Sequence, residues 1–117
     1  MKSIIVAAGI MDAKPHTGLH GYDVFDNVIT YVQFERLMNA GGPTAGQIIR
    51  PSDKEHAHRI GWIQCAGRGL DHGVPYCSKV CCMVAAKQTI ITKEHDASVE
   101  TNIYYNDLKA YGKGFWP

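Results

Sequence analysis

The strongest hydrophobic pattern in this chain is a strand, a turn, a helix and a second strand within residues 59–106. Residues 59–64 (RIGWIQ) predict a strand that leads into a glycine-containing turn. From residue 78 to 91, apolar side chains return at helical spacing, which predicts a helix packed on a sheet. Residues 99–106 (VETNIYYN) alternate as a strand does. Such a βαβ unit has parallel strands, so the predicted fold class is α/β with a parallel sheet.

The first half of the chain is less regular. Residues 3–9 (SIIVAAG) form a continuous apolar run, which predicts a strand buried on both faces. Thr30 and Gln33 have the spacing of a capping box, so a helix is predicted to begin at Thr30. Residues 41–58 are rich in turn formers and charges, and within them residues 47–49 predict a short edge strand.

Composition limits the classes of partner. The chain has 117 residues and a net charge of +1, with basic and acidic residues scattered along it. The sequence therefore has no basic patch that would indicate binding to nucleic acid or to an anionic membrane surface. The apolar run at the N-terminus is too short for a signal peptide or a bilayer span, so we expect a cytoplasmic protein without membrane insertion.

Four cysteines carry the candidate chemistry. Cys65 ends the first predicted strand of the βαβ unit, Cys77 opens the helix, and Cys81 and Cys82 lie one turn further on. In a reducing compartment such a group favours metal binding or redox chemistry over disulfides. Cys77 and Cys81 share a helix face, whereas Cys82 is rotated by about 100°, so all four converge more easily on a centre larger than one metal ion. A [4Fe–4S] cluster has that size and takes one thiolate per iron.

Two other interpretations of the cysteines stay open from the residues alone. A zinc-stabilised structural module would hold the helix to the strand and use Trp116 to dock a partner, although adjacent cysteines fit a tetrahedral zinc site poorly. A redox-sensing thiol protein would use Cys81 or Cys82 as the attacking thiolate.

The same turn is where dinucleotide-binding proteins place their glycine fingerprint. Here Gly67 and Gly69 are present, but His72 occupies the third glycine position, and Asp107 is a weak candidate for a ribose-binding carboxylate. The fingerprint is therefore incomplete, and cysteines occupy the turn instead.

Nearly the whole chain resembles the A subunit of heterodisulfide reductase and its relatives, including the flavin subunit of the quinone-interacting membrane-bound oxidoreductase. The most specific stretch is WIQCAGRGLDHGVPYCSKVCCMVAAKQTIITKEHDASVETNIYYNDLKAYGKGF, with Cys-x₁₁-Cys-x₃-Cys-Cys inside it. The upstream pieces IIVAAG, NVITYVQFERLMNAGGPTAG and IIRPSD resemble the same family in the same order. The resemblance concerns the central segment of that family.

The resemblance implies the cofactor and its ligands. It implies that Cys65, Cys77, Cys81 and Cys82 hold a [4Fe–4S] cluster on a Rossmann-like, thioredoxin-reductase-like nucleotide domain that has lost its pyridine nucleotide. It implies an electron relay between a flavin and other clusters in a multi-subunit oxidoreductase, with flavin-bearing and ferredoxin-like chains as partners.

The resemblance also implies two segments and a limited flavin contact. Residues 1–58 correspond to a partial flavin domain, and residues 59–117 to the βαβ cluster-binding segment. The family's FAD-binding G-x-G-x-x-G and its ferredoxin-like cysteine motifs are not in this sequence. Ala7, Ala8 and Gly9 resemble a flavin-lining turn, with Ala8 in place of the usual Thr, so FAD is expected only where additional chain segments complete the pocket.

Overall fold

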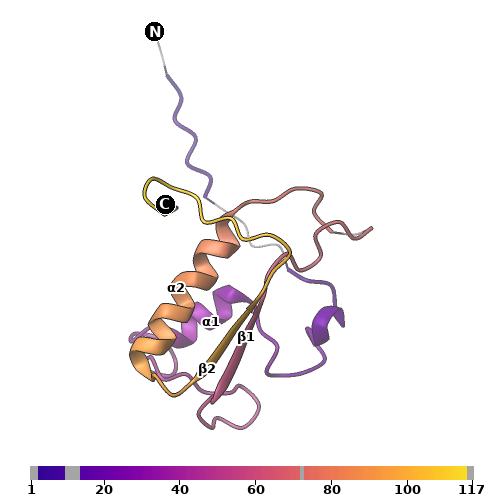
Figure 1. Ribbon diagram of the computed structural model, residues 1–117. Coiled ribbons are helices and arrows are strands. Elements are labelled where there is room, and N and C mark those ends of the chain that lie inside the picture. Colours follow the sequence, from indigo (N-terminus) through magenta and orange to yellow (C-terminus); the bar gives the residue numbers. More distant parts are fainter. Residues whose placement is uncertain (1–2, 10–13, 72, 116–117) are drawn as a thin grey trace.

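A computed structural model describes residues 3–9, 14–71 and 73–115 of the chain (Figure 1). Its elements follow in the order 3₁₀ helix η1 (Leu19–Gly21), α1 (Tyr31–Met38), β1 (Arg59–Ile63), α2 (Val80–His95) and β2 (Glu100–Tyr104). The strands β1 and β2 pair in parallel, with Trp62 opposite Ile103. The α/β class with a parallel sheet is therefore confirmed, and β1, α2 and β2 form the expected βαβ unit.

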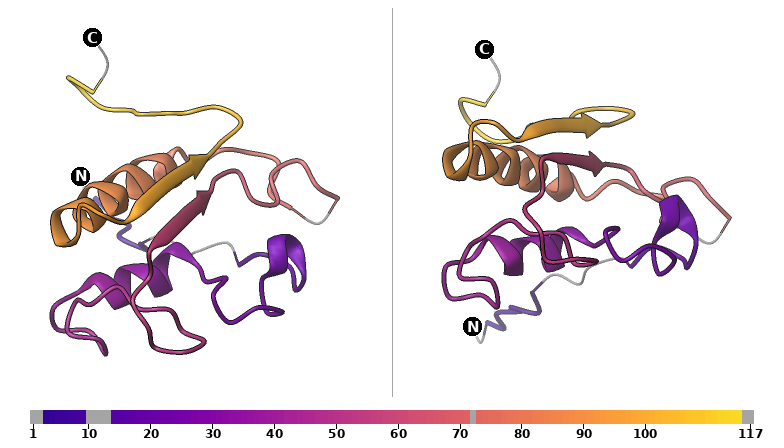
Figure 2. Two further views of the ribbon diagram at one scale, coloured as in Figure 1. Left: turned by 60° about the horizontal axis from the view of Figure 1, so that its bottom comes forward. Right: turned by 90° about the horizontal axis from the view of Figure 1, so that it is seen from below.

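Both helices lie on one side of the strand pair, and they lie next to each other (Figures 1 and 2). The indole ring of Trp62 reaches this side and meets Phe34 of α1 edge-on, with ring centroids 5.6 Å apart. Trp62 also donates from Nε1 to Oε1 of Gln88 on α2, at 3.0 Å. Strand β1 is thus tied to both helices through one side chain. The buried core contains Phe34, Met38, Ile48, Ala57, Trp62 and Ala85.

Gln88 is fully buried, and both the oxygen and the nitrogen of its side-chain amide form hydrogen bonds. Its Nε2 donates to the carbonyl oxygen of Tyr31 at 2.9 Å and to Oε2 of Glu35 at 3.0 Å. Lys87 pairs with the same carboxylate, and its hydrogen bond, followed by that of Gln88, lowers the pKa of Glu35. A buried amide with all its partners in place specifies one packing of α2 on α1, because any other packing would leave polar atoms unpaired.

Helix α1 begins as the sequence predicts. The backbone N–H of Gln33 donates to Oγ1 of Thr30 at 3.3 Å, and the N–H of Thr30 donates to Oε1 of Gln33 at 2.7 Å. This reciprocal pair satisfies two N–H groups that the helix itself leaves unpaired. The predicted capping box at Thr30 is confirmed.

Replacing Thr30 with alanine is expected to lower the free energy of unfolding by about 1 kcal/mol, because one first-turn N–H loses its acceptor. Urea unfolding followed by circular dichroism measures the change. Arg36→Ala, on the exposed face of the same helix, is the control and is expected to change stability by less than about 0.5 kcal/mol. Equal losses in the two variants would contradict a specific capping role.

Two strand predictions in the first half were wrong. Residues 3–9 form no strand and extend away from the rest of the molecule, with Ile4 90% and Ile5 91% exposed (Figure 1). A buried strand needs neighbouring strands and a cover on both faces, and among the described residues only β1 and β2 pair along their length. The expected edge strand at 47–49 is reduced to one antiparallel bridge between Ile49 and His56.

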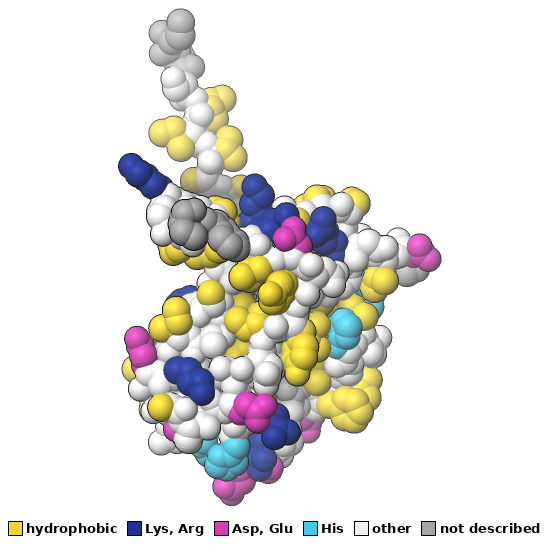
Figure 3. Space-filling view, in the orientation of Figure 1, with side chains coloured by type: hydrophobic (Ala, Val, Ile, Leu, Met, Phe, Trp, Pro, Cys, Tyr) yellow, Lys and Arg dark blue, Asp and Glu magenta, His cyan; other side chains and the backbone are white. Residues whose placement is uncertain are grey.

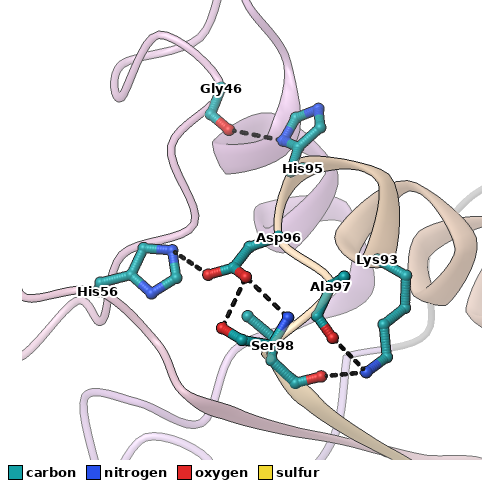
Figure 4. Close-up of polar contacts among 8 residues, drawn as sticks. Gly46, His56, Lys93, His95, Asp96, Ala97 and Ser98 are labelled. Carbon is teal, nitrogen blue, oxygen red and sulfur yellow. Dashed lines mark hydrogen bonds and ion pairs between the residues drawn. The ribbon is translucent and has the colours of Figure 1, made fainter.

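The C-terminal end of α2 is held by polar contacts (Figure 4). Lys93 donates from Nζ to the carbonyl oxygens of Ala97, at 3.1 Å, and Val99, at 2.5 Å. His95 Nδ1 lies 3.1 Å from the carbonyl oxygen of Gly46. A cation near the last turn complements the helix dipole and orders the short connection into β2.

Candidate metal centre

The four cysteines lie around one end of the βαβ unit. Cys65 follows β1, Cys77 precedes α2, and Cys81 and Cys82 are in the first turn of α2. Parallel strands end at the same edge of a sheet, so the turn after β1 and the start of α2 meet there (Figure 1). The βαβ topology therefore brings together cysteines that the sequence separates.

Three of the four cysteines line the same cavity. Cys65, Cys77 and Cys81 contribute to the wall of a cavity of about 660 Å³, which also reaches Trp62 and Phe34 in the core. Cys82 is 2% exposed, and its Sγ lies 3.8 Å from the carbonyl oxygen of Asp107, just after β2. Cys82 follows Cys81 in the first turn of α2, but its side chain is buried on another face of the helix.

The backbone around the cysteines adopts conformations that L-residues rarely take. Cys65 and Lys79 have positive φ angles of 59° and 63°, in the left-handed region. At Cys65 this conformation turns the chain out of β1. At Lys79 it directs the backbone N–H to Sγ of Cys77, at 3.4 Å. Such strained positions are found at functional sites, and here one is a cysteine and the other lies between Cys77 and Cys81.

The loop between Cys65 and Cys77 is tightly folded on itself. The N–H of Gly73 donates to the carbonyl oxygen of Leu70 at 2.9 Å, and a Cβ at Gly73 would lie 1.6 Å from the carbonyl oxygen of Gly67. Only glycine permits that close approach of two backbone segments. Gly73 thus lets the connection from Cys65 to Cys77 come close to Gly67.

Gly73→Ala is expected to push the loop away from Gly67 and to lower the metal content of the purified protein, with a strain of about 1–3 kcal/mol. Metal per chain, measured together with the thermal unfolding midpoint, reports the effect. Gly41→Ala is the control, because its Cβ would meet only the side-chain oxygen of Asn39, at 3.3 Å. Unchanged metal content in Gly73→Ala would show that the loop is not needed to place the cysteines.

The thiols lie within electrostatic reach of one another. Burial raises the pKa of the Cys81 thiol, and the charges of Cys82, Cys77 and Cys65 raise it further. Four thiolates gathered in this space repel one another, so a cation is needed to hold them deprotonated together. Four thiolates are the usual donor set of an iron–sulfur cluster, and they also bind zinc.

The candidate ligands are not gathered around one point. Among the residues that the structure describes, no three His, Cys, Asp or Glu side chains come close enough to hold a single metal ion. Cys65, Cys77 and Cys81 line the same cavity, whereas the Cys82 side chain points to the carbonyl oxygen of Asp107.

Charged side chains beside the site come from the segment after β2. Asp107 and Lys109 form an ion pair, and the hydrogen bond between them lowers the pKa of Asp107 and raises that of Lys109. Arg68, in the turn after β1, acts on both groups electrostatically. The sequence pattern indicates Asp107 only as a weak candidate for a ribose ligand, and it predicts no role for Lys109. The feature that could have placed Asp107 beside the cysteines is its position after a strand parallel to the one that ends near Cys65.

The remaining predicted residues are not part of this arrangement. Ala7, Ala8 and Gly9 are exposed in the extended segment and do not line the cavity, so their flavin contact stays a prediction. His72 and Trp116 lie outside the described residues.

The fold and the cysteines together define an α/β segment with a thiol-lined cavity at the start of a crossover helix. The chain is 50% identical over 97 residues to the iron-sulfur A subunit of CoB–CoM heterodisulfide reductase from Methanocaldococcus jannaschii, a match of 82% of this chain and 15% of that protein. It is 48% identical over 115 residues to an iron-sulfur A subunit of the same enzyme from Methanopyrus kandleri, covering 97% of this chain and 18% of that protein. It is 44% identical over 115 residues to the A subunit of the H₂:CoB–CoM heterodisulfide,ferredoxin reductase of Methanothermobacter thermautotrophicus, with the same coverage of 97% and 18%.

The resemblance found in the sequence is thereby confirmed: nearly the whole chain is homologous to a segment of the A subunit of heterodisulfide reductase. The chain spans less than a fifth of the length of these curated relatives. No protein-family model matches it. The described residues contain no helix that is both long enough and apolar enough to cross a bilayer.

Proposed function

We propose that this chain is an electron-transfer segment that binds one [4Fe–4S] cluster through Cys65, Cys77, Cys81 and Cys82. The observation that carries the proposal is that three of these cysteines line one cavity, and the fourth directly follows Cys81 in the first turn of α2. The relatives named as iron-sulfur subunits support the same kind of cofactor. A cluster of this type accepts and releases single electrons without making or breaking bonds to the polypeptide.

The chain's own residues then hold and shield the cluster. The cysteine thiolates supply the ligands, and the N–H of Lys79 donates to Sγ of Cys77, which stabilises its negative charge. The start of α2 adds the positive end of the helix dipole at Cys81 and Cys82. Trp62 and Phe34, on the inner wall of the cavity, keep that side apolar.

The proposed setting is a cytoplasmic complex like that of heterodisulfide reductase. Electrons would pass between a flavin and other clusters, which flavin-bearing and ferredoxin-like chains or segments supply. FAD contact through Ala7, Ala8 and Gly9 belongs to this proposal and needs additional chain segments, because these residues lie on an exposed extension.

The two alternative functions have less support. A single tetrahedral zinc ion binds sulfur at about 2.3 Å, and the adjacent Cys81 and Cys82 fit that geometry poorly. A reactive thiol usually has a lowered pKa, whereas burial and then the neighbouring cysteines raise the pKa of Cys81, which argues against Cys81 as the attacking thiolate.

Anaerobic purification followed by iron, acid-labile sulfide and zinc analysis tests the proposal. About four irons and four sulfides per chain are expected, with a visible absorption that dithionite bleaches. One zinc and no sulfide would overturn the proposal in favour of the structural module. A folded protein with neither metal would overturn it in favour of thiol chemistry.

A further inference from the structure

The segment that follows β2 crosses the cysteine site. Figure 3 shows basic and acidic side chains gathered in the region where, in the same view of Figure 1, this segment passes the start of α2. The carbonyl oxygen of Asp107 lies 3.8 Å from Sγ of Cys82, so the backbone of this segment contacts the site directly. Two residues further on, the Lys109 ammonium pairs with the Asp107 carboxylate.

The ion pair is close to the thiols but partly in solvent. The side chains of Lys109 and Asp107 are 34% and 56% exposed. Lys109 also interacts electrostatically with Cys77, and Arg68 acts on both members of the pair. Two cations and one carboxylate therefore lie within electrostatic reach of one another beside the cysteine site. Neither charged group of the pair is a candidate ligand, so each can act on the site only through its charge and its position.

We propose that the Asp107–Lys109 pair sets the reduction potential of the cluster-binding site, with Lys109 raising it and Asp107 lowering it. This inference rests on the proposed function, since it requires a redox cluster on the four cysteines. Reduction adds one electron from an external reductant and makes the site more negative by one charge, with no bond formed or broken. A nearby cation stabilises the reduced form, and a nearby carboxylate destabilises it.

The pairing makes the two effects partly cancel. In the native protein, the carboxylate of Asp107 neutralises much of the field of Lys109 at the cysteines. Removal of either charge alone exposes the other, so the two single substitutions act in opposite directions. Because both groups are partly solvated, the effects are modest and become smaller as the salt concentration rises.

The test uses Lys109→Gln, Asp107→Asn and the double variant, each purified anaerobically with its iron content measured. Midpoint potentials come from dithionite titrations followed by visible absorption at low ionic strength. At the wild-type midpoint, the ratio of reduced to oxidised cluster is expected to fall about threefold in Lys109→Gln and to rise about threefold in Asp107→Asn. The double variant is expected to lie near the wild type. A tenfold ratio corresponds to about 59 mV for one electron.

The control is Lys113→Gln, which removes the same charge from an exposed position four residues along the segment. Shifts of the same sign in both single variants, or shifts no larger than that of Lys113→Gln, would overturn the inference. Loss of iron from Lys109→Gln or Asp107→Asn alone would also overturn it, because that residue would then hold the site together instead of tuning it. Absence of iron and sulfide from the wild-type protein would refute the proposed function itself, which is a separate result.

Discussion

Replacing Cys81 with serine is expected to remove most of the iron from the purified protein. Cys81 lies in the first turn of α2 and lines the cavity with Cys65 and Cys77, so its loss leaves one iron of the proposed cluster without a thiolate. Serine is a far weaker ligand for iron at neutral pH because its hydroxyl stays protonated. Iron content is expected to fall from about four per chain to less than about one, with loss of visible absorption.

The same measurement on the other cysteines tests the whole ligand set. Cys65→Ser, Cys77→Ser and Cys82→Ser are expected to lose iron as Cys81→Ser does. Ser78→Ala is the matched control, since it removes a polar group beside Cys77 without removing a thiol. A serine variant that keeps its full iron content would remove that cysteine from the ligand set.

Cys82 is the most informative of the four. Its Sγ now faces the carbonyl oxygen of Asp107, so the side chain has to turn toward the cavity to bind iron. If Cys82→Ser keeps iron while the other three variants lose it, the site holds its cluster through three cysteines. Loss of iron from all four variants would establish the four-cysteine set.

Trp62→Ala is expected to lower the free energy of unfolding by about 3–5 kcal/mol. The substitution removes the ring that packs edge-on against Phe34 and leaves a cavity between β1 and the two helices. It also takes the hydrogen-bond donor away from the buried Oε1 of Gln88. A loss of this size is a large part of the stability of a small domain. Urea unfolding of the metal-free protein measures it without a contribution from cofactor binding.

Tyr104→Ala is the control for Trp62→Ala. Tyr104 is also an aromatic residue of this sheet, but it is 60% exposed. Its replacement is therefore expected to change stability by less than about 1 kcal/mol. Equal losses in the two variants would show that the side of the sheet facing the helices does not carry the stability of the unit.

The core and the site are physically connected through α2. Trp62 and the fully buried Gln88 determine where α2 lies against β1 and α1. Cys81 and Cys82 are on the first turn of the same helix, so the core also determines where their sulfur atoms lie. Trp62→Ala is therefore expected to weaken cluster binding as well as folding.

Local chemistry explains which features could be predicted from the sequence by itself. The strand patterns in 59–64 and 99–106, the helical stripe between them and the capping box at Thr30 act over a few residues, and the structure contains the strands, the helix and the cap. The grouping of the cysteines also follows from the βαβ order, because the ends of parallel strands share an edge.

The tertiary structure decided what depends on distant partners. Residues 3–9 have the composition of a buried strand, but burial requires neighbours that no local pattern supplies, and the segment is exposed. The hydrogen bonds of the Gln88 amide and the contact of Asp107 with Cys82 join residues far apart in sequence. They could therefore be found only from the tertiary structure. The sequence by itself determined the βαβ elements, the helix cap and the donor atoms, and the packing decided how these donors and the surrounding charges are placed.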